Sequence, residues 1–171
     1  MQIRSAIPKD AELIAEVHVA AWQAAYRGLM PDSFLDQLTV EKRTALWQRS
    51  LTQPNPGTLI VAENLGFLAG FCLFGPTRDA DGQDKRVGEI VALNVRPSNW
   101  RGGVGRALCD YALSEAPNRE WKVITLWVLK ENERARRFYE ALGFSLDGTE
   151  RIETNLIGAP INEIRYSKVL S

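Results

Sequence analysis

The sequence predicts a mixed α/β protein, and two observations carry that prediction. Along the 171 residues the spacing of the hydrophobic residues predicts, in order, a strand, helices, three strands, a helix, a strand, a helix and two strands. Residues 90–95 form an apolar strand that runs into a turn with Gly102, Gly103 and Gly105, where a helical pattern begins at once. Alternating strands and helices at this length are typical of one layered domain around one core, here residues 1–171.

The first third of the chain is mainly helical. Residues 3–6 read as a short strand, and Pro8 suits the first turn of the helix that follows. Gly28 is placed to end this helix. We expect two more helical pieces, over residues 31–38 and 40–51.

Strands and helices then alternate. Residues 58–63 and 67–74 are β-like runs joined by Asn-Leu-Gly, which indicates a hairpin. The polar stretch 77–85 is rich in Gly and Asp, and we expect a mobile loop there. The remaining elements are strands at 87–95, 121–128, 144–153 and 162–169, and helices from the glycine turn to about Ala116 and over 132–142.

Charge and hydropathy exclude several classes of protein. The formal net charge is zero, which gives no electrostatic case for nucleic acid or an anionic membrane as a partner. No apolar run approaches the roughly 20 residues that span a bilayer, and the N-terminal residues lack a signal-peptide core. We therefore expect a cytoplasmic protein in which Cys72 and Cys109 are buried free thiols.

The glycine turn predicts an anion site that suits a pyrophosphate. Gly103 and Gly105 let the backbone approach a ligand without a Cβ in the way. The N-terminus of the next helix aims its N–H groups and its dipole at the same point. Arg101 and Arg106 are candidates to pair with phosphate oxygens. An alternative stays open, in which the glycines serve only close packing and the arginines lie at the solvent-exposed start of the helix without binding a ligand.

A second group of residues lies on the helix at 132–142. Asn132, Ala135 and Tyr139 are spaced at i, i+3 and i+7, so they share one face of this helix. Judged alone, a tyrosine at position 139 is more often a core aromatic residue with a satisfied hydroxyl than a catalyst.

These two motifs, residues 95–108 and 132–144 with a strand at 121–128 between them, resemble the GCN5-related N-acetyltransferase (GNAT) superfamily. The resemblance covers essentially the whole chain. It implies a mixed, mostly antiparallel sheet of six to seven strands, splayed at its central parallel pair and flanked by about four helices. It also implies acetyl-CoA as cosubstrate, no metal, and direct transfer of the acetyl group to an amine in a ternary complex.

The resemblance assigns a cofactor site. It implies that the pyrophosphate sits on the glycine turn and that the pantetheine arm lies in the split of the sheet. The residues it implies are Leu93, Asn94, Val95, Trp100, Arg101, Gly102, Gly103, Val104, Gly105, Arg106, Asn132, Ala135 and Arg136. For Asn132, a helix N-cap is the plain alternative, compatible with that role.

One position departs from the family pattern. Trp100 stands where the family usually has Arg or Gln. The backbone anion site survives this change, because it needs amides rather than a particular side chain. The side-chain contact to phosphate is then in doubt, with Arg101 as the candidate to supply it.

The resemblance also implies the catalytic groups. Tyr139 matches the family's general acid, which protonates the leaving thiolate, and Glu89 stands where histone-modifying members carry a general base. A solvent-facing strand carboxylate is the alternative for Glu89, and a water chain could deprotonate a primary amine without a dedicated base. The backbone amides at 93–95 would polarise the thioester carbonyl.

The acceptor side is less defined. Trp22, Tyr26 and Arg27 are the expected contacts of a small-molecule or peptide amine, although the stripe that His18 forms with these aromatics is typical of a core. A homodimer is possible. An acyl-CoA sensor or scaffold without turnover remains the main alternative. A doubly wound nucleotide-binding protein is disfavoured, because its glycine turn would follow the first strand.

Overall fold

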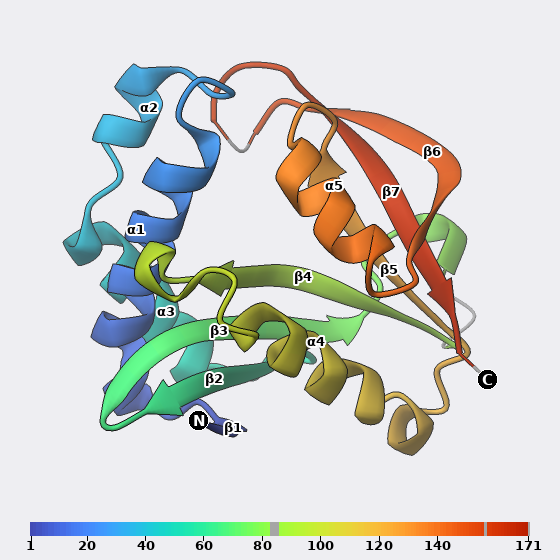
Figure 1. Cartoon of the computed structure of the whole chain (residues 1–171), viewed down its shortest axis with the longest axis horizontal. Coiled ribbons are helices and arrows are strands. Elements are labelled where there is room, and N and C mark those ends of the chain that lie inside the picture. The colour runs from blue at the N-terminus through green and yellow to red at the C-terminus, as the bar shows by residue number, and fades with distance from the viewer. Residues whose placement is uncertain (83–85, 156, 171) are drawn as a thin grey trace. The chain divides into compact units, whose positions relative to one another are not determined.

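The strands form one mixed sheet, whose elements Figure 1 labels along the ribbon. The computed structural model describes residues 1–82, 86–155 and 157–170. In this part of the chain seven strands are hydrogen-bonded in the order β1-β2-β3-β4-β5-β7-β6. The strands are β1 (Gln2–Ser5), β2 (Thr58–Asn64), β3 (Phe67–Pro76), β4 (Val87–Val95), β5 (Val123–Leu129), β6 (Ser145–Glu153) and β7 (Ile161–Val169). The α-helices are α1 (Ala11–Tyr26), α2 (Asp32–Asp36), α3 (Val40–Thr52), α4 (Val104–Ser114) and α5 (Glu133–Glu140).

The predicted α/β class is confirmed. β4 and β5 pair in parallel over the first three residues of each strand, Val87–Glu89 with Val123–Thr125. The pairs β1–β2, β2–β3, β5–β7 and β6–β7 are antiparallel. The described residues contain five α-helices, one at each place where the sequence predicts a helical piece. Among them, no helix is long and apolar enough to cross a membrane.

The chain divides into two compact units. The first comprises Met1–Gly75 and Ile90–Glu115, and the second comprises Pro76–Glu89 and Ala116–Ser171. β4 contributes residues to both. That residues 1–171 act as one domain stays a prediction.

Alternation along β2 and β3 builds the core of the first unit. Leu59 and Val61 pack with Phe71 and with apolar residues of α1 and α3 in one buried cluster. The residues that alternate with these along each strand point to the other face of the sheet. There Gly70 lets α4 come close, since a Cβ on it would lie 3.1 Å from the side chains of both Val104 and Leu108. Helices thus cover both faces of these strands.

Both cysteines are buried in the first unit. Cys72 lies on β3 and Cys109 on α4, and both are free thiols, as predicted. Burial raises the pKa of the Cys72 thiol well above its usual value.

His18 is a buried, neutral residue of α1. It is the only histidine of the chain and is 7 % exposed. The indole N–H of Trp47 donates to its Nδ1 (3.1 Å), so the ring proton belongs on Nε2, which has no partner among the described residues. Burial first, and then the charge of Arg43, lowers the pKa of His18 to about 3. Its ring also contacts Trp22 and Phe71, so the core interpretation is confirmed for this residue.

In the second unit α5 contacts β7, where the Tyr166 hydroxyl donates to the Glu140 carboxylate of the helix (2.6 Å). The side chain of Asn132 caps α5 by accepting the backbone N–H of Ala135 (3.1 Å), as expected for an N-cap. Gly143 follows the helix with a left-handed φ of +82°, which few other residues adopt. On β4, Gly88 is packed so closely against the Trp121 ring that a Cβ there would clash with it.

The burial of His18 makes the stability of the protein depend on pH. Unfolded His18 titrates near 6.5, whereas the folded ring stays neutral down to about pH 3. Protons therefore bind mainly to the unfolded state as the pH falls below 6.5, and stability is lost. We expect urea unfolding to show roughly 2 kcal/mol less stability at pH 5 than at pH 7.

His18→Asn is the matched control, because it keeps an acceptor for the Trp47 indole but does not titrate. In that variant the difference in unfolding free energy between pH 5 and pH 7 should fall to the part that the carboxylates contribute. That part is the same in both proteins. Equal pH dependence in both would show that His18 is not buried as described.

Candidate active site

The glycine turn presents the start of α4 as an open backbone site. Gly103 is the N-cap of α4, with a left-handed φ of +79°, and its carbonyl accepts the backbone N–H of Ala107 (3.0 Å). A Cβ built on Gly103 meets no atom within 4 Å, so the space beside it is open to a ligand. The first N–H groups of a helix lack partners within the helix and favour an anion there. The residues present therefore fit a pyrophosphate.

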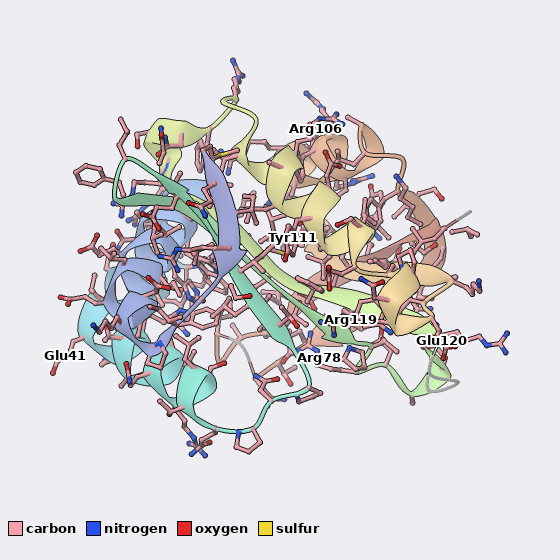
Figure 2. The ribbon with its side chains drawn as sticks, turned by 90° about the horizontal axis from the view of Figure 1, so that it is seen from below. Glu41, Arg78, Arg106, Tyr111, Arg119 and Glu120 are labelled. Atoms are coloured by element: carbon pink, nitrogen blue, oxygen red, sulfur yellow. The ribbon has the colours of Figure 1, made fainter. Side chains whose placement is uncertain are left out.

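Two arginines flank this turn. Arg101 is exposed and has a left-handed backbone, with φ of +63°. Arg106 is exposed in the first turn of α4, and Figure 2 shows it on that helix together with Tyr111. Both cations thus lie near the helix start, as the anion-site interpretation requires.

Trp100 is turned back toward the strand that precedes it. Its indole N–H donates to the carbonyl of Val95, the last residue of β4, at 2.8 Å. The side chain at the family's Arg or Gln position thus holds the protein backbone. Leu93 and Asn94, the other predicted cofactor contacts on β4, are half-buried.

Glu89 is a buried carboxylate held by Arg78. Its side chain is 1 % exposed, so the alternative of a solvent-facing carboxylate is wrong. The Arg78 guanidinium donates to Oε1 at 2.5 Å, and the Arg78 backbone N–H donates to Oε2 at 2.9 Å. The side-chain hydrogen bond to Glu89 raises the pKa of Arg78, whose own side chain is 60 % exposed. Both oxygens of the predicted base are therefore engaged.

Arg165 organises the charges around the same loop. It is 11 % exposed and pairs with Asp79 (3.1 Å), Asp81 (2.7 Å) and Asp147 (2.6 Å). The hydrogen bond to Arg165 lowers the pKa of Asp81. The indole N–H of Trp127, on β5, donates to Asp79 at 3.0 Å. These contacts attach the segment before β4 to β5 and β7.

This result differs from the mobile loop expected over residues 77–85. Thr77 donates its backbone N–H to the carbonyl of Val87 (3.0 Å), and the ion pairs of Asp79 and Asp81 follow directly. Residues 83–85 lie outside the described residues. Sequence reasoning missed Arg78 and this network, because no local pattern shows which strands a polar loop will contact.

Tyr139 is a buried aromatic residue of α5. It is 9 % exposed, and its ring packs edge-on against Phe138 and Phe144. On the same helix, Arg136 donates to the hydroxyl of Tyr166 (3.2 Å) and to the carbonyl of Lys130 (3.2 Å). Burial thus supports the core interpretation of Tyr139, which is compatible with a catalytic hydroxyl.

The predicted acceptor residues lie at the end of α1. Trp22 and Tyr26 are half-buried, with ring centroids 5.0 Å apart. Arg27 is exposed and pairs with Asp32 (3.1 Å) and Asp36 (3.0 Å) on α2. Its charge is therefore already matched within the protein.

The predicted site residues divide between the units. The cofactor residues 93–106 and the acceptor residues belong to the first unit. Glu89 and Tyr139 belong to the second, together with Asn132, Ala135 and Arg136. Among the described residues, no group of three or more His, Cys, Asp or Glu side chains is arranged to hold a metal ion.

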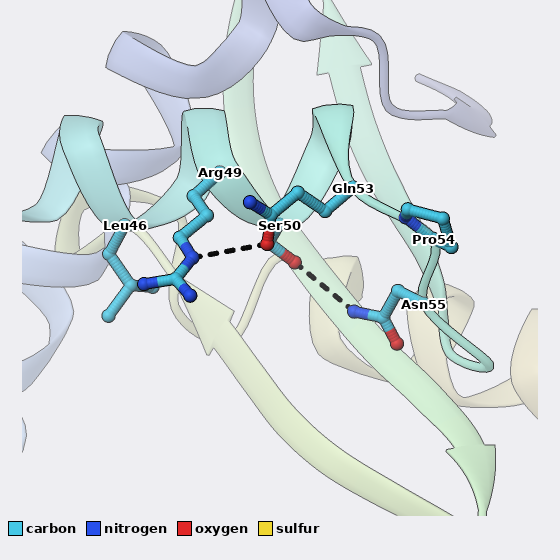
Figure 3. Close-up of a pocket in the computed structure, with 6 residues that line it drawn as sticks. All are labelled: Leu46, Arg49, Ser50, Gln53, Pro54 and Asn55. Atoms are coloured by element: carbon cyan, nitrogen blue, oxygen red, sulfur yellow. Dashed lines mark hydrogen bonds between the residues drawn. The ribbon is translucent and has the colours of Figure 1, made fainter.

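A surface depression at the end of α3 lies apart from these residues in the sequence. Its volume is about 230 Å³, and its lining residues are Leu46, Arg49, Ser50, Gln53, Pro54 and Asn55 (Figure 3). Hydrogen bonds from Arg49 to Gln53 (3.1 Å) and from Asn55 to Ser50 (3.3 Å) occupy its polar groups. We assign it no function.

Comparison with known proteins identifies the family. The family model described as the acetyltransferase (GNAT) family matches residues 19–144. The chain belongs to this family and is an N-acetyltransferase. A Mycobacterium tuberculosis protein named as a probable N-acetyltransferase is 29 % identical over 170 residues, which cover 97 % of this chain and 92 % of that protein.

Two solved structures share the fold. The PaiA N-acetyltransferase of Thermoplasma acidophilum, solved with coenzyme A, superposes with a TM-score of 0.75 at 18 % identity, covering 99 % of this chain and 98 % of that one. YncA of Salmonella typhimurium, solved with acetyl-CoA, has a TM-score of 0.71 at 22 % identity, covering 100 % and 94 %. The fold of this chain is therefore the GNAT fold.

The Arg78–Glu89 pair yields a stability prediction. Arg78→Met removes the guanidinium contacts of the buried Glu89 carboxylate and leaves it the backbone N–H of residue 78 as donor. We expect a loss of about 2 kcal/mol, less than for a fully buried pair because water reaches the arginine side of this one. Chemical denaturation of Arg78→Met measures the loss, and adding Glu89→Gln should recover part of it. An unchanged stability would show that the pair contributes nothing.

Proposed function

We propose that this protein transfers an acetyl group from acetyl-CoA to a primary amine of a small molecule or a protein, directly in a ternary complex. The observation that carries the proposal is the start of α4, where Gly103 leaves open space beside a helix N-terminus. Coenzyme A in the Thermoplasma protein and acetyl-CoA in the Salmonella protein support the choice of cosubstrate.

The chemistry requires removal of a proton from the acceptor. At pH 7 a lysine-like amine of pKa 10.4 is neutral in about one molecule in 2,500, which corresponds to roughly 4.6 kcal/mol. Glu89 remains our candidate for the base. Because Arg78 donates to both of its oxygens, Glu89 would accept a proton in competition with these contacts. A water chain to solvent is the alternative route.

The leaving thiolate requires a proton donor, and we assign that role to Tyr139. A phenol can donate locally to a thiolate, and the buried, packed ring of Tyr139 fixes the direction of its hydroxyl. Backbone N–H groups at 93–95 would polarise the thioester carbonyl, and Asn132 would contact the pantetheine or an ordered water while capping α5.

Tyr139→Phe tests the acid. We expect kcat to fall by about 10²–10³, because the thiolate loses its donor, with little change in acetyl-CoA affinity. Thiol release with an active amine measures kcat, and calorimetry measures affinity. Tyr111→Phe on α4 is the matched control and should leave both unchanged. An unaltered kcat in Tyr139→Phe would eliminate Tyr139 as the acid.

Thermal unfolding with saturating acetyl-CoA, beside NADH and ATP, tests the cofactor. Ligand at about 100 times Kd adds roughly 2.7 kcal/mol, a shift of several degrees at this size. We expect the shift with acetyl-CoA alone, and we expect Gly103→Val to abolish it. The valine side chain would occupy the space of the ligand, and its φ would be strained. It would not clash with the protein itself, because no protein atom lies within 4 Å of a Cβ at this position.

Gly66→Val is the matched control, because Gly66 has a φ of +83° and equally open surroundings in the β2–β3 turn. It should lose similar stability and keep the acetyl-CoA shift. A normal shift in Gly103→Val would remove the pyrophosphate from this turn. No shift in the unmodified protein would contradict the proposed cosubstrate.

A further inference from the structure

We propose that Trp100 is a positioning residue for the cofactor. Its indole N–H holds the loop between β4 and α4 in the shape that presents the amides of the glycine turn. This inference rests on the proposed binding of acetyl-CoA at that turn. It goes further by giving a role to the one position where the sequence departs from the pattern of its family.

The contact closes the loop on itself. The Trp100 indole donates to the carbonyl of Val95 at 2.8 Å, so the end of the strand is joined to the residue just before the glycine turn. The backbone between them forms successive tight turns, in which Asn99 donates to Arg96 (2.8 Å) and Trp100 donates to Pro97 (3.2 Å). A loop braced in this way has little freedom to move the amides that follow it.

The near end of the loop is fixed separately. The backbone N–H of Arg96 donates to the carbonyl of Ala69 (2.8 Å), and its guanidinium reaches the carbonyl of Leu68 (3.3 Å) and the carboxylate of Glu16 (3.0 Å). These contacts anchor Arg96 to β3 and α1. The indole of Trp100 supplies the corresponding anchor at the far end.

The residue after Trp100 shows why an anchor is needed. Arg101 has a φ of +63°, a left-handed conformation that is uncommon and costly for a residue with a side chain. Such a conformation persists only when its surroundings hold it. The bonded Trp100 precedes it, and the backbone N–H of Gly102 donates back to Asn99 (3.3 Å).

The position of the indole has a consequence for phosphate binding. Because Trp100 points to Val95, the site depends on ordered amides, with Arg101 and Arg106 as the nearby cations. A preorganised site binds more tightly because it loses less conformational freedom on binding. Weakening the brace should therefore raise the Kd of acetyl-CoA while leaving the overall fold in place.

Trp100→Phe removes the N–H and keeps an aromatic ring. We expect calorimetry to show a Kd for acetyl-CoA about tenfold higher, the size of one hydrogen bond. Trp47→Phe is the matched control, because it also removes an indole N–H bond, to His18 at 3.1 Å, in the same unit. It should lower the melting temperature and leave the Kd unchanged.

Hydrogen exchange of residues 96–103 without ligand provides a second readout that needs no cofactor. We expect faster exchange in Trp100→Phe and no change in Trp47→Phe. Unchanged Kd and unchanged exchange in Trp100→Phe would overturn the inference. A higher Kd without faster exchange would also overturn it, and would make Trp100 a direct contact of the cofactor.

The two proposals fail in different ways. If the unmodified protein does not bind acetyl-CoA, the proposed function fails, and the role of Trp100 fails with it. If the unmodified protein binds acetyl-CoA and Trp100→Phe binds it equally well, only the role of Trp100 is lost.

Discussion

The site depends on one backbone constraint, the left-handed conformation at the junction of β4 and α4. Gly103 adopts a φ of +79°, so the chain turns sharply and α4 begins at once. Any side chain there would strain this turn and enter the space beside the helix start. The positive end of the helix therefore stays open. The anchoring of Arg96 and the indole bond of Trp100 both serve to hold this geometry.

Burial decides how the polar groups of the second unit act. Glu89 is almost fully buried and keeps its charge matched because Arg78 donates to it from both its backbone and its side chain. A carboxylate held in this way is a strong structural contact. If Glu89 acts as the proposed base, its carboxylate takes up a proton beside the Arg78 contacts, so stability and activity would depend on the same ion pair.

Much of the fold follows from periodicity and turn chemistry. The strand–turn–helix at residues 90–113, the N-cap at Asn132 and the stop at Gly143 are local features, so short-range sequence signals predict them. The loop before β4 was predicted less well. The ion pairs of Asp79 and Asp81 in this segment depend on Arg165, which is far away in the sequence, and no local pattern contains that information.

By itself, the sequence determined the α/β class, the glycine turn, the family resemblance and the list of candidate site residues. Only the tertiary structure showed that Glu89 is buried against Arg78, that His18 is neutral, and that Trp100 bonds to Val95. The physical reason is the range of the interactions. Caps, turns and amphipathic faces depend on neighbours a few residues away, whereas burial and ion pairing depend on segments that only folding brings together.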